Sequence, residues 1–288
     1  MPVGRILVPV SSARLLESKL DHALALARHF GSRIDVVFAH GAVDPLYVER
    51  NPPLDAAWGM AEIEWSREAT PLVDVMARLD AWLKVNGISH GGTAADLAGV
   101  SLEFLELRGD DPHLLDHHAR TADLIVIGQP GPGSAPTEPA INKLAVVESG
   151  RAVLVVPNAA PPAENMLAHV LIAWDGGLRA SRSVALGMPI FAVSKRVTIF
   201  TAGDSNEVWS RQHLMLEYFA RNGITAHAKG EDYDSTRIGG ALVDSAERWG
   251  VSLICMGAYE RARTAELIFG GNTWRVYTNS RRPVLLAH

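Results

Sequence analysis

The sequence predicts an α/β protein of two tandem domains, each a parallel sheet of about five strands with helices on both faces. The first observation behind this prediction is a repeat, because similar landmarks recur in the same order in both halves of the 288-residue chain. The second is that the strand-like segments are continuous apolar runs, a pattern typical of strands buried on both faces. The third is that these runs alternate with helical stretches, which indicates right-handed βαβ crossovers and hence a parallel sheet.

The repeat consists of paired segments that share their apolar character and their order along the chain. The pairs are residues 5–10 and 169–174, 15–30 and 178–193, 33–39 and 196–202, 122–128 and 251–257, and 149–156 and 280–287. A repeat unit of this length indicates a duplicated domain, because solenoid repeats are far shorter. We therefore expect domains over residues 1–157 and 168–288, with the Pro/Ala-rich residues 158–167 as the linker.

The two copies differ in their middle parts. The first copy carries an insertion at residues 40–53 and a long helical stretch at 57–85 that Pro71 should kink or break. A loop is expected at 87–99, with a short helix within it as an alternative. The second copy is more compact. Its middle part is predicted to hold a helix at 207–222, a strand at 224–229 and a helix at 235–250. The last strands, 152–156 and 283–287, are expected to join the copies as an intramolecular pseudo-dimer.

Composition narrows the classes of partner. The net charge of −5 provides no broad basic field, so nucleic acid is not expected as a partner. No apolar run reaches the roughly 18 residues of a membrane span, so no membrane is expected either. The single cysteine, Cys255, cannot form an internal disulfide and lies among apolar residues, which predicts an inert core thiol. We expect a cytoplasmic protein.

A ligand site is expected beyond the carboxyl ends of the strands, where ligands bind in open parallel sheets. In the second copy, Asp175 follows the first strand, Gly257 ends the fourth, and Gly270, Gly271 and Thr273 precede the last helix. Glycines let a backbone approach phosphates, and a helix start offers free N–H groups. Two simpler interpretations stay open: the glycines serve only as turns, and Asp175 caps the helix that follows it.

These residues resemble the universal stress protein family. Its nucleotide-binding members carry Gly, two residues, Gly, nine residues, then Gly with Ser or Thr, and an Asp after the first strand. The second copy matches with Gly257, Gly270 and Asp175, and the resemblance covers nearly the whole chain outside the inserted middle. It implies two Rossmann-like (adenine nucleotide alpha hydrolase-like) domains and a stress-response role. It further implies ATP or a related adenine nucleotide, with Mg²⁺ accompanying it, and association of two chains.

The second copy departs from the family pattern at two positions. Glu260 stands at the family's second glycine, and a carboxylate there would face the phosphates. Two like charges about 4 Å apart cost on the order of a few kcal/mol at an effective dielectric of about 20. Arg261, Arg263 or a bridging metal ion would offset that cost. Gly271 takes the Ser/Thr position, and Thr273 offers a substitute hydroxyl two residues later.

The first copy departs further and is expected to be degenerate. Ser11 takes the acidic position, and Ile141 stands where the third glycine belongs. The loop at residues 132–139 is rich in proline, which lacks the N–H donor a phosphate needs.

No catalytic motif is found in the sequence, so we expect a sensor or signalling module rather than an enzyme. Slow ATP hydrolysis stays open. There are two alternatives. The first is a non-nucleotide scaffold or partner-binding stress protein, in which Glu260 closes the phosphate site. The second is an adenylate-handling enzyme, for which no base or metal cluster is found. His117 and His118 point to different sides of a helix and make a poor metal pair.

Overall fold

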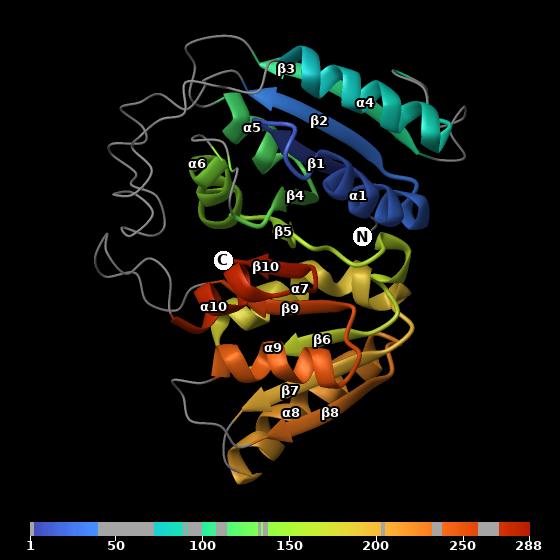
Figure 1. Ribbon diagram of the computed structural model, residues 1–288. Helices are drawn as coiled ribbons and strands as arrows, with labels where there is room; N and C mark the ends of the chain where they lie inside the picture. Colours follow the sequence, from blue (N-terminus) through green and yellow to red (C-terminus); the bar gives the residue numbers. More distant parts are fainter. Residues whose placement is uncertain are drawn as a thin grey trace.

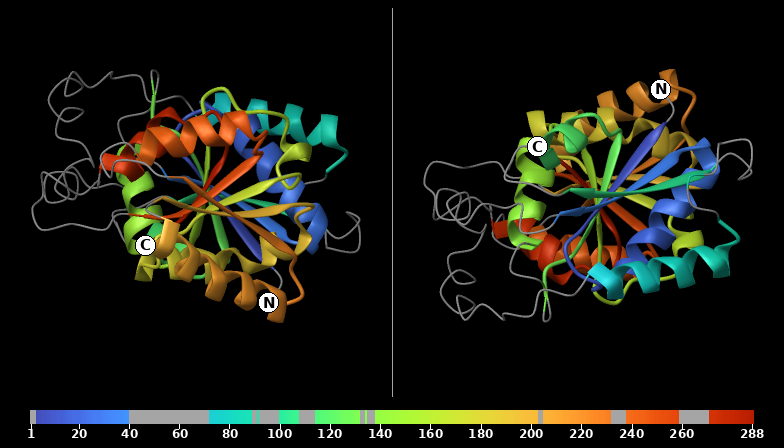
Figure 2. Two further views of the ribbon diagram at one scale, coloured as in Figure 1. Left: turned by 90° about the horizontal axis from the view of Figure 1, so that it is seen from below. Right: turned by 90° about the horizontal axis from the view of Figure 1, so that it is seen from above.

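The computed structural model describes residues 3–39, 72–88, 91, 100–107, 114–131, 134, 138–202, 205–231, 238–258 and 271–288. The strands share one sheet and the helices cover its two faces (Figures 1 and 2). The strands are β1 Arg5–Val10, β2 Arg33–Ala39, β3 Ser101–Leu107, β4 Leu124–Gly128, β5 Ala152–Val156, β6 Val170–Ala173, β7 Val197–Ala202, β8 Ala226–Glu231, β9 Leu253–Gly257 and β10 Val284–Ala287. The α-helices are α1 Leu16–Phe30, α4 Leu72–Asn86, α5 Leu114–Arg120, α6 Glu138–Lys143, α7 Leu178–Val193, α8 Ser205–Arg221, α9 Ile238–Arg248 and α10 Gly271–Asn279.

Within the described residues the sheet has ten strands in the order β3-β2-β1-β4-β5-β10-β9-β6-β7-β8. Every pairing is parallel except that of β5 with β10, which is antiparallel and joins the two halves. The predicted α/β fold and the predicted pairing of the last strands are both confirmed. In each half the strand order reverses beside the first strand, between β1 and β4 and between β6 and β9, which is where open sheets bind ligands.

The strands are buried on both faces because each face has its own apolar layer. In β1, Ile6 and Val8 pack into one hydrophobic cluster while Leu7 between them packs into the other. Both clusters contain residues of both copies, so the core continues across the β5–β10 junction. The continuous apolar runs of the sequence follow from this double burial.

Several predicted boundaries shift in the structure. The strand predicted at 224–229 is β8, two residues later, and its side chains are exposed or part-exposed because it forms the sheet edge. Helices α8 and α9 lie within about three residues of their predicted limits. Of the long helix predicted at 57–85, the described part is α4, and the rest, with the Pro71 kink and the 40–53 insertion, lies outside the described residues.

The segment between the two copies packs against the protein. It contains a short 3-10 helix, η2 Ala163–Asn165, followed by Met166 and Leu167, which are buried in the core. Helix α6 continues directly into a short π-helix, η1 Leu144–Glu148, before β5.

Candidate functional site

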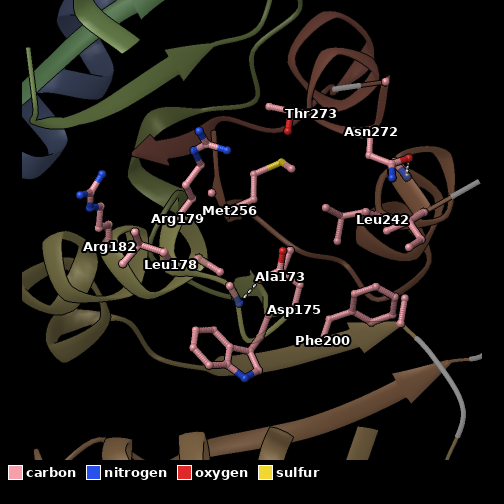
Figure 3. Close-up of a pocket in the computed structure, with 18 residues that line it drawn as sticks. Ala173, Asp175, Leu178, Arg179, Arg182, Phe200, Leu242, Met256, Asn272 and Thr273 are labelled. Carbon is pink, nitrogen blue, oxygen red and sulfur yellow. Dashed lines mark hydrogen bonds between the residues drawn. The ribbon is translucent and has the colours of Figure 1, made fainter. Parts of the chain in front are cut away.

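The second copy contains a cavity of about 640 Å³ at the carboxyl ends of β6, β7 and β9. Its lining includes Asp175, Gly257, Gly271 and Thr273, so the structure brings together four of the six residues selected from the sequence. The other two, Glu260 and Gly270, lie outside the described residues. Figure 3 shows Asp175 and Phe200 on one side of the cavity and Asn272 and Thr273 on the opposite side.

A tight turn positions Asp175 after β6. Its Oδ1 accepts a hydrogen bond from the backbone N–H of Gly177 at 2.7 Å, and Gly176 between them has a φ of 79°, which favours glycine. Gly177 is itself the residue before α7, and no side chain caps that helix. Asp175 therefore closes the turn rather than capping α7, and its carboxylate stays exposed at the cavity wall.

Gly257 allows the start of α7 to pack against the end of β9. A Cβ atom at this position would lie 2.7 Å from the nitrogen of Ala180 and 2.8 Å from the carbonyl carbon of Arg179. Only a glycine permits this backbone approach without a shift. The need for glycine at position 257 is therefore structural.

Gly239, which was not selected from the sequence, has the same role between α9 and α10. A Cβ atom there would lie 2.6 Å from the backbone oxygen of Asn272, and the Gly239 N–H donates to Asn272 Oδ1 at 2.9 Å. The starts of α7, α9 and α10 consequently all line the cavity. Helix starts carry partial positive charge and free N–H groups, so three of them together favour an anion.

Two arginines of the first turns of α7 add positive charge to the cavity. Arg179 and Arg182 both line it, and Arg182 Nη1 donates to the backbone oxygen of His288 at 3.3 Å. The pKa of His288 is lowered by burial and then by these two guanidinium groups. Asp175 is the one carboxylate among the described lining residues. Sequence reasoning missed these arginines, although two cations spaced three apart, beginning two residues after Gly177, were a usable signal.

The cavity also has an apolar wall. Phe200, Leu242 and Met256 line it together with Trp174, whose indole nitrogen donates to the backbone oxygen of Arg211 at 3.1 Å. Phe200 lies on the side of Asp175, whereas Thr273 and Asn272 lie across the cavity at the start of α10, and Met256 and Leu242 lie between the two sides (Figure 3). The cavity therefore suits a ligand with a flat apolar part at one end and an anionic part at the other.

The fold matches solved structures over nearly its whole length. A universal stress protein from Archaeoglobus fulgidus superposes with a TM-score of 0.63 at 15% sequence identity, covering 99% of this chain and 96% of the other.

The chain has the fold of a tandem universal stress protein.

Two further structures share this universal stress protein fold. A functionally unknown protein from Pseudomonas aeruginosa matches with a TM-score of 0.58 at 13% identity, covering 99% and 92% of the two chains. The cytoplasmic domain of a prokaryotic cation chloride cotransporter matches with a TM-score of 0.53 at 8% identity, covering 98% of this chain and 94% of the other. No model of a known family and no curated protein matches the sequence. One fold thus occurs in proteins of different kinds, and function must be argued from the site.

In the first copy of the universal stress protein fold, side chains occupy the position corresponding to the cavity. Arg14 Nη1 donates to Glu138 Oε1 at 3.0 Å, and Arg14 Nη2 donates to the backbone oxygen of Gln129 at 2.7 Å and to Asn158. Arg14 and Glu138 are nearly buried, with side-chain exposures of 12% and 8%. A Cβ atom on Gly128, the counterpart of Gly257, would meet Leu15 at 3.1 Å and Glu138 at 3.2 Å.

The structure also locates two other first-copy positions that were named from the sequence, Ser11 and Ile141. Ser11 follows β1, and Ile141 is buried within α6, where it packs in the core. Lys19 is also buried, and its Nζ donates to the backbone oxygen of Pro9 at 3.2 Å. Burial lowers the pKa of Lys19 to about 8 despite the attraction of Glu138.

Metal binding, membrane insertion and the chemistry of Cys255 are the remaining expectations from the sequence. Among the described residues, no group of three or more His, Cys, Asp or Glu side chains could hold a metal ion. No described helix combines the length and apolar character needed to cross a membrane. Cys255 is fully buried, and burial raises its pKa to about 12, as expected of an inert core thiol.

Proposed function

We propose that the second copy binds ATP or a related adenine nucleotide, and that the protein is a stress-response sensor or signalling module rather than an enzyme. The observation that carries this proposal is the polarity of the cavity. The aromatic ring of Phe200 and Asp175 lie on one side, and the start of α10 lies on the other, with Arg179 between them (Figure 3). An adenine nucleotide has the same polarity, with a flat base, a ribose that donates hydrogen bonds, and phosphates.

In this proposal each lining group meets a distinct part of the nucleotide. The Asp175 carboxylate accepts hydrogen bonds from the adenosine part, and its Oδ1 is held in place by Gly177. The starts of α7, α9 and α10, together with Arg179, supply N–H groups and positive charge for phosphates. The proposed phosphate contacts include the backbone at Gly257, Gly270 and Gly271 and the hydroxyl of Thr273. Mg²⁺ would enter with the phosphates, where it would neutralise their charge.

The test is calorimetry of the full chain with ATP, with and without Mg²⁺, and with adenosine. We expect ATP to bind at micromolar to millimolar concentration and adenosine to bind more weakly, because adenosine lacks the groups that the helix starts and arginines attract. Asp175→Asn keeps the Oδ1 acceptor of the turn but removes the charge. It should weaken both ligands about tenfold, the magnitude of one charge-assisted hydrogen bond. No heat at millimolar ATP would contradict the proposal.

The second candidate is a scaffold or partner-binding protein that holds no nucleotide. The match to a cotransporter's cytoplasmic domain favours it, because there the same fold forms part of a larger assembly. Glu260 favours it too, since a carboxylate at the second glycine position would repel phosphate. Purified protein that carries no nucleotide and takes up none would support this candidate. A third possibility, an adenylate-handling enzyme, is tested by searching for reaction products after long incubation of the protein with ATP.

A further inference from the structure

Helix α10 belongs to two environments at once. Its first turn, Gly271 to Thr273, lines the cavity of the second copy. Its other end, around Tyr277 and Ser280, lies against the first copy, across the β5–β10 junction (Figure 1). The first copy therefore contacts the same helix that would present N–H groups to a ligand.

Gln129 of the first copy provides the main contact to the end of α10. Its side-chain Nε2 donates to the backbone oxygen of Tyr277 at 2.8 Å and to that of Ser280 at 3.1 Å. Its Oε1 accepts from the backbone N–H of Asn158 at 3.0 Å. The amide thus uses both donors and its acceptor while only 4% exposed, which fixes its orientation.

Asn142 of α6 holds the Tyr277 side chain. Its Nδ2 donates to the Tyr277 hydroxyl at 3.0 Å and to the backbone oxygen of Gly128 at 3.1 Å. Both side chains are 2% exposed, and burial raises the pKa of Tyr277 well above its ordinary value, so the hydroxyl keeps its proton. Losing either partner would remove a buried hydrogen bond.

This arrangement has no equivalent at the matching position of the second copy. The N–H of Gln129 donates to Val156 at 2.8 Å, and the N–H of Ala258 donates to Ala287 at 2.8 Å, so Gln129 and Ala258 are counterparts. Ala258 has no polar side chain with which to cross the junction. The residue after the fourth strand therefore makes side-chain hydrogen bonds across the junction in the first copy, where it is Gln129, and not in the second copy, where it is Ala258.

The side chains that fill the site of the first copy also contact the residues that hold Gln129 against α10. Arg14, which occupies the position corresponding to the cavity, donates to the backbone oxygen of Gln129 and to the side chain of Asn158. Asn158 is also the residue whose backbone N–H donates to the Gln129 side-chain oxygen. The side chains that fill the first site are therefore continuous with the network that holds α10.

We propose that Gln129 and Asn142 are positioning residues for the cavity of the second copy, and that the first copy has become a clamp on α10. They fix Tyr277 and Ser280, and the helix transmits that placement to Gly271, Asn272 and Thr273. The consequence for ligand affinity rests on the proposed function, whereas the clamp itself does not.

The first test measures hydrogen–deuterium exchange of the α10 amides, residues 275–279, in the full chain without ligand. Gln129→Ala and Asn142→Ala should accelerate this exchange about tenfold, in proportion to the loss of one or two buried hydrogen bonds. Ser149→Ala is the matched control, because Ser149 is buried in the first copy and bonds Ala145 and Arg151 of its own copy. Unchanged α10 exchange in both variants, or equal acceleration in the control, would overturn the clamp.

The second test uses ATP and a double-mutant cycle. Asn142→Ala should weaken ATP binding about three- to tenfold, and this loss should largely vanish in a Tyr277→Phe background, where the hydroxyl partner is already absent. If the losses of ATP affinity caused by Asn142→Ala and Tyr277→Phe are fully additive, Asn142 does not act through the Tyr277 hydroxyl, and its positioning role is overturned. If the wild-type protein binds no ATP, the proposed function fails, while the exchange experiment still decides whether the clamp exists.

Discussion

A Cβ atom on Gly257 would lie 2.7 Å from the backbone nitrogen of Ala180, closer than real Cβ contacts allow. This pair of residues joins the end of β9 to the first turn of α7, and the cavity opens beside the junction. Gly271, at the start of α10, has nothing within 4 Å of the same imagined atom. Packing therefore requires a glycine at position 257 and does not require one at position 271.

Gly257→Ala should destabilise the protein by about 1–3 kcal/mol, because the added methyl group meets backbone atoms that can only move together with α7. Gly271→Ala is the matched control. It should leave the stability unchanged or raise it by up to about 1 kcal/mol, because alanine favours a helix more than glycine does. Urea denaturation of both variants measures the difference. Equal stability of the two variants would contradict the close packing at Gly257.

Arg179→Gln should weaken ATP about tenfold and adenosine hardly at all, because the guanidinium group would act on the phosphates. The loss should shrink at high salt, since screening weakens an exposed charge. Arg28→Gln in the last turn of α1 removes the same charge far from the cavity and serves as the control. Calorimetry with both ligands checks the prediction, and an equal loss for adenosine would contradict it.

Glu260→Gly should tighten ATP binding if the carboxylate repels the phosphates, as the sequence comparison predicts. The expected gain is about tenfold or more, the equivalent of removing a like charge near the phosphates. Glu260→Gln separates charge from backbone freedom, because glutamine removes the charge and keeps the side chain. Calorimetry would show unchanged or weaker binding if a metal ion or arginine already neutralises Glu260.

Lys19 makes a pH-dependent contribution to stability. Burial lowers its pKa from 10.5 to about 8 in the folded protein. Between these values the unfolded chain holds more protons, so raising the pH favours folding by an amount on the order of 3 kcal/mol. Lys19→Met should remove this rise and stabilise the protein near pH 7, where the wild type keeps a buried charge.

The measurement is the difference in unfolding free energy between wild type and Lys19→Met from pH 7 to 10.5. A difference is needed because the raised pKa of Cys255 makes both proteins lose stability above pH 9. Lys84→Met, at an exposed position of α4, should show no such change with pH. A difference that stays flat from pH 7 to 10.5 would contradict the prediction, because it would mean that Glu138 compensates for burial and that Lys19 keeps its ordinary pKa in the folded protein.

Much of the fold could be predicted from local patterns. The apolar runs that became β1, β4, β5 and β9 were found because burial on both faces leaves a signal within a few residues. Strand β3 was not assigned, because Glu103 and Glu106 interrupt its apolar pattern at the sheet edge. Edge strands bury less, so their sequences carry a weaker signal.

By itself, the sequence determined the duplication, the parallel strands, the joining of the last strands and the place of Asp175 and Gly257 at strand ends. The tertiary structure alone decided that Arg14 fills the first site and that Gln129 reaches Tyr277, 148 residues away. Strand burial is a property of neighbouring residues and is therefore visible in the sequence. Side-chain contacts between distant segments depend on how whole elements pack, and a single sequence carries no local trace of them.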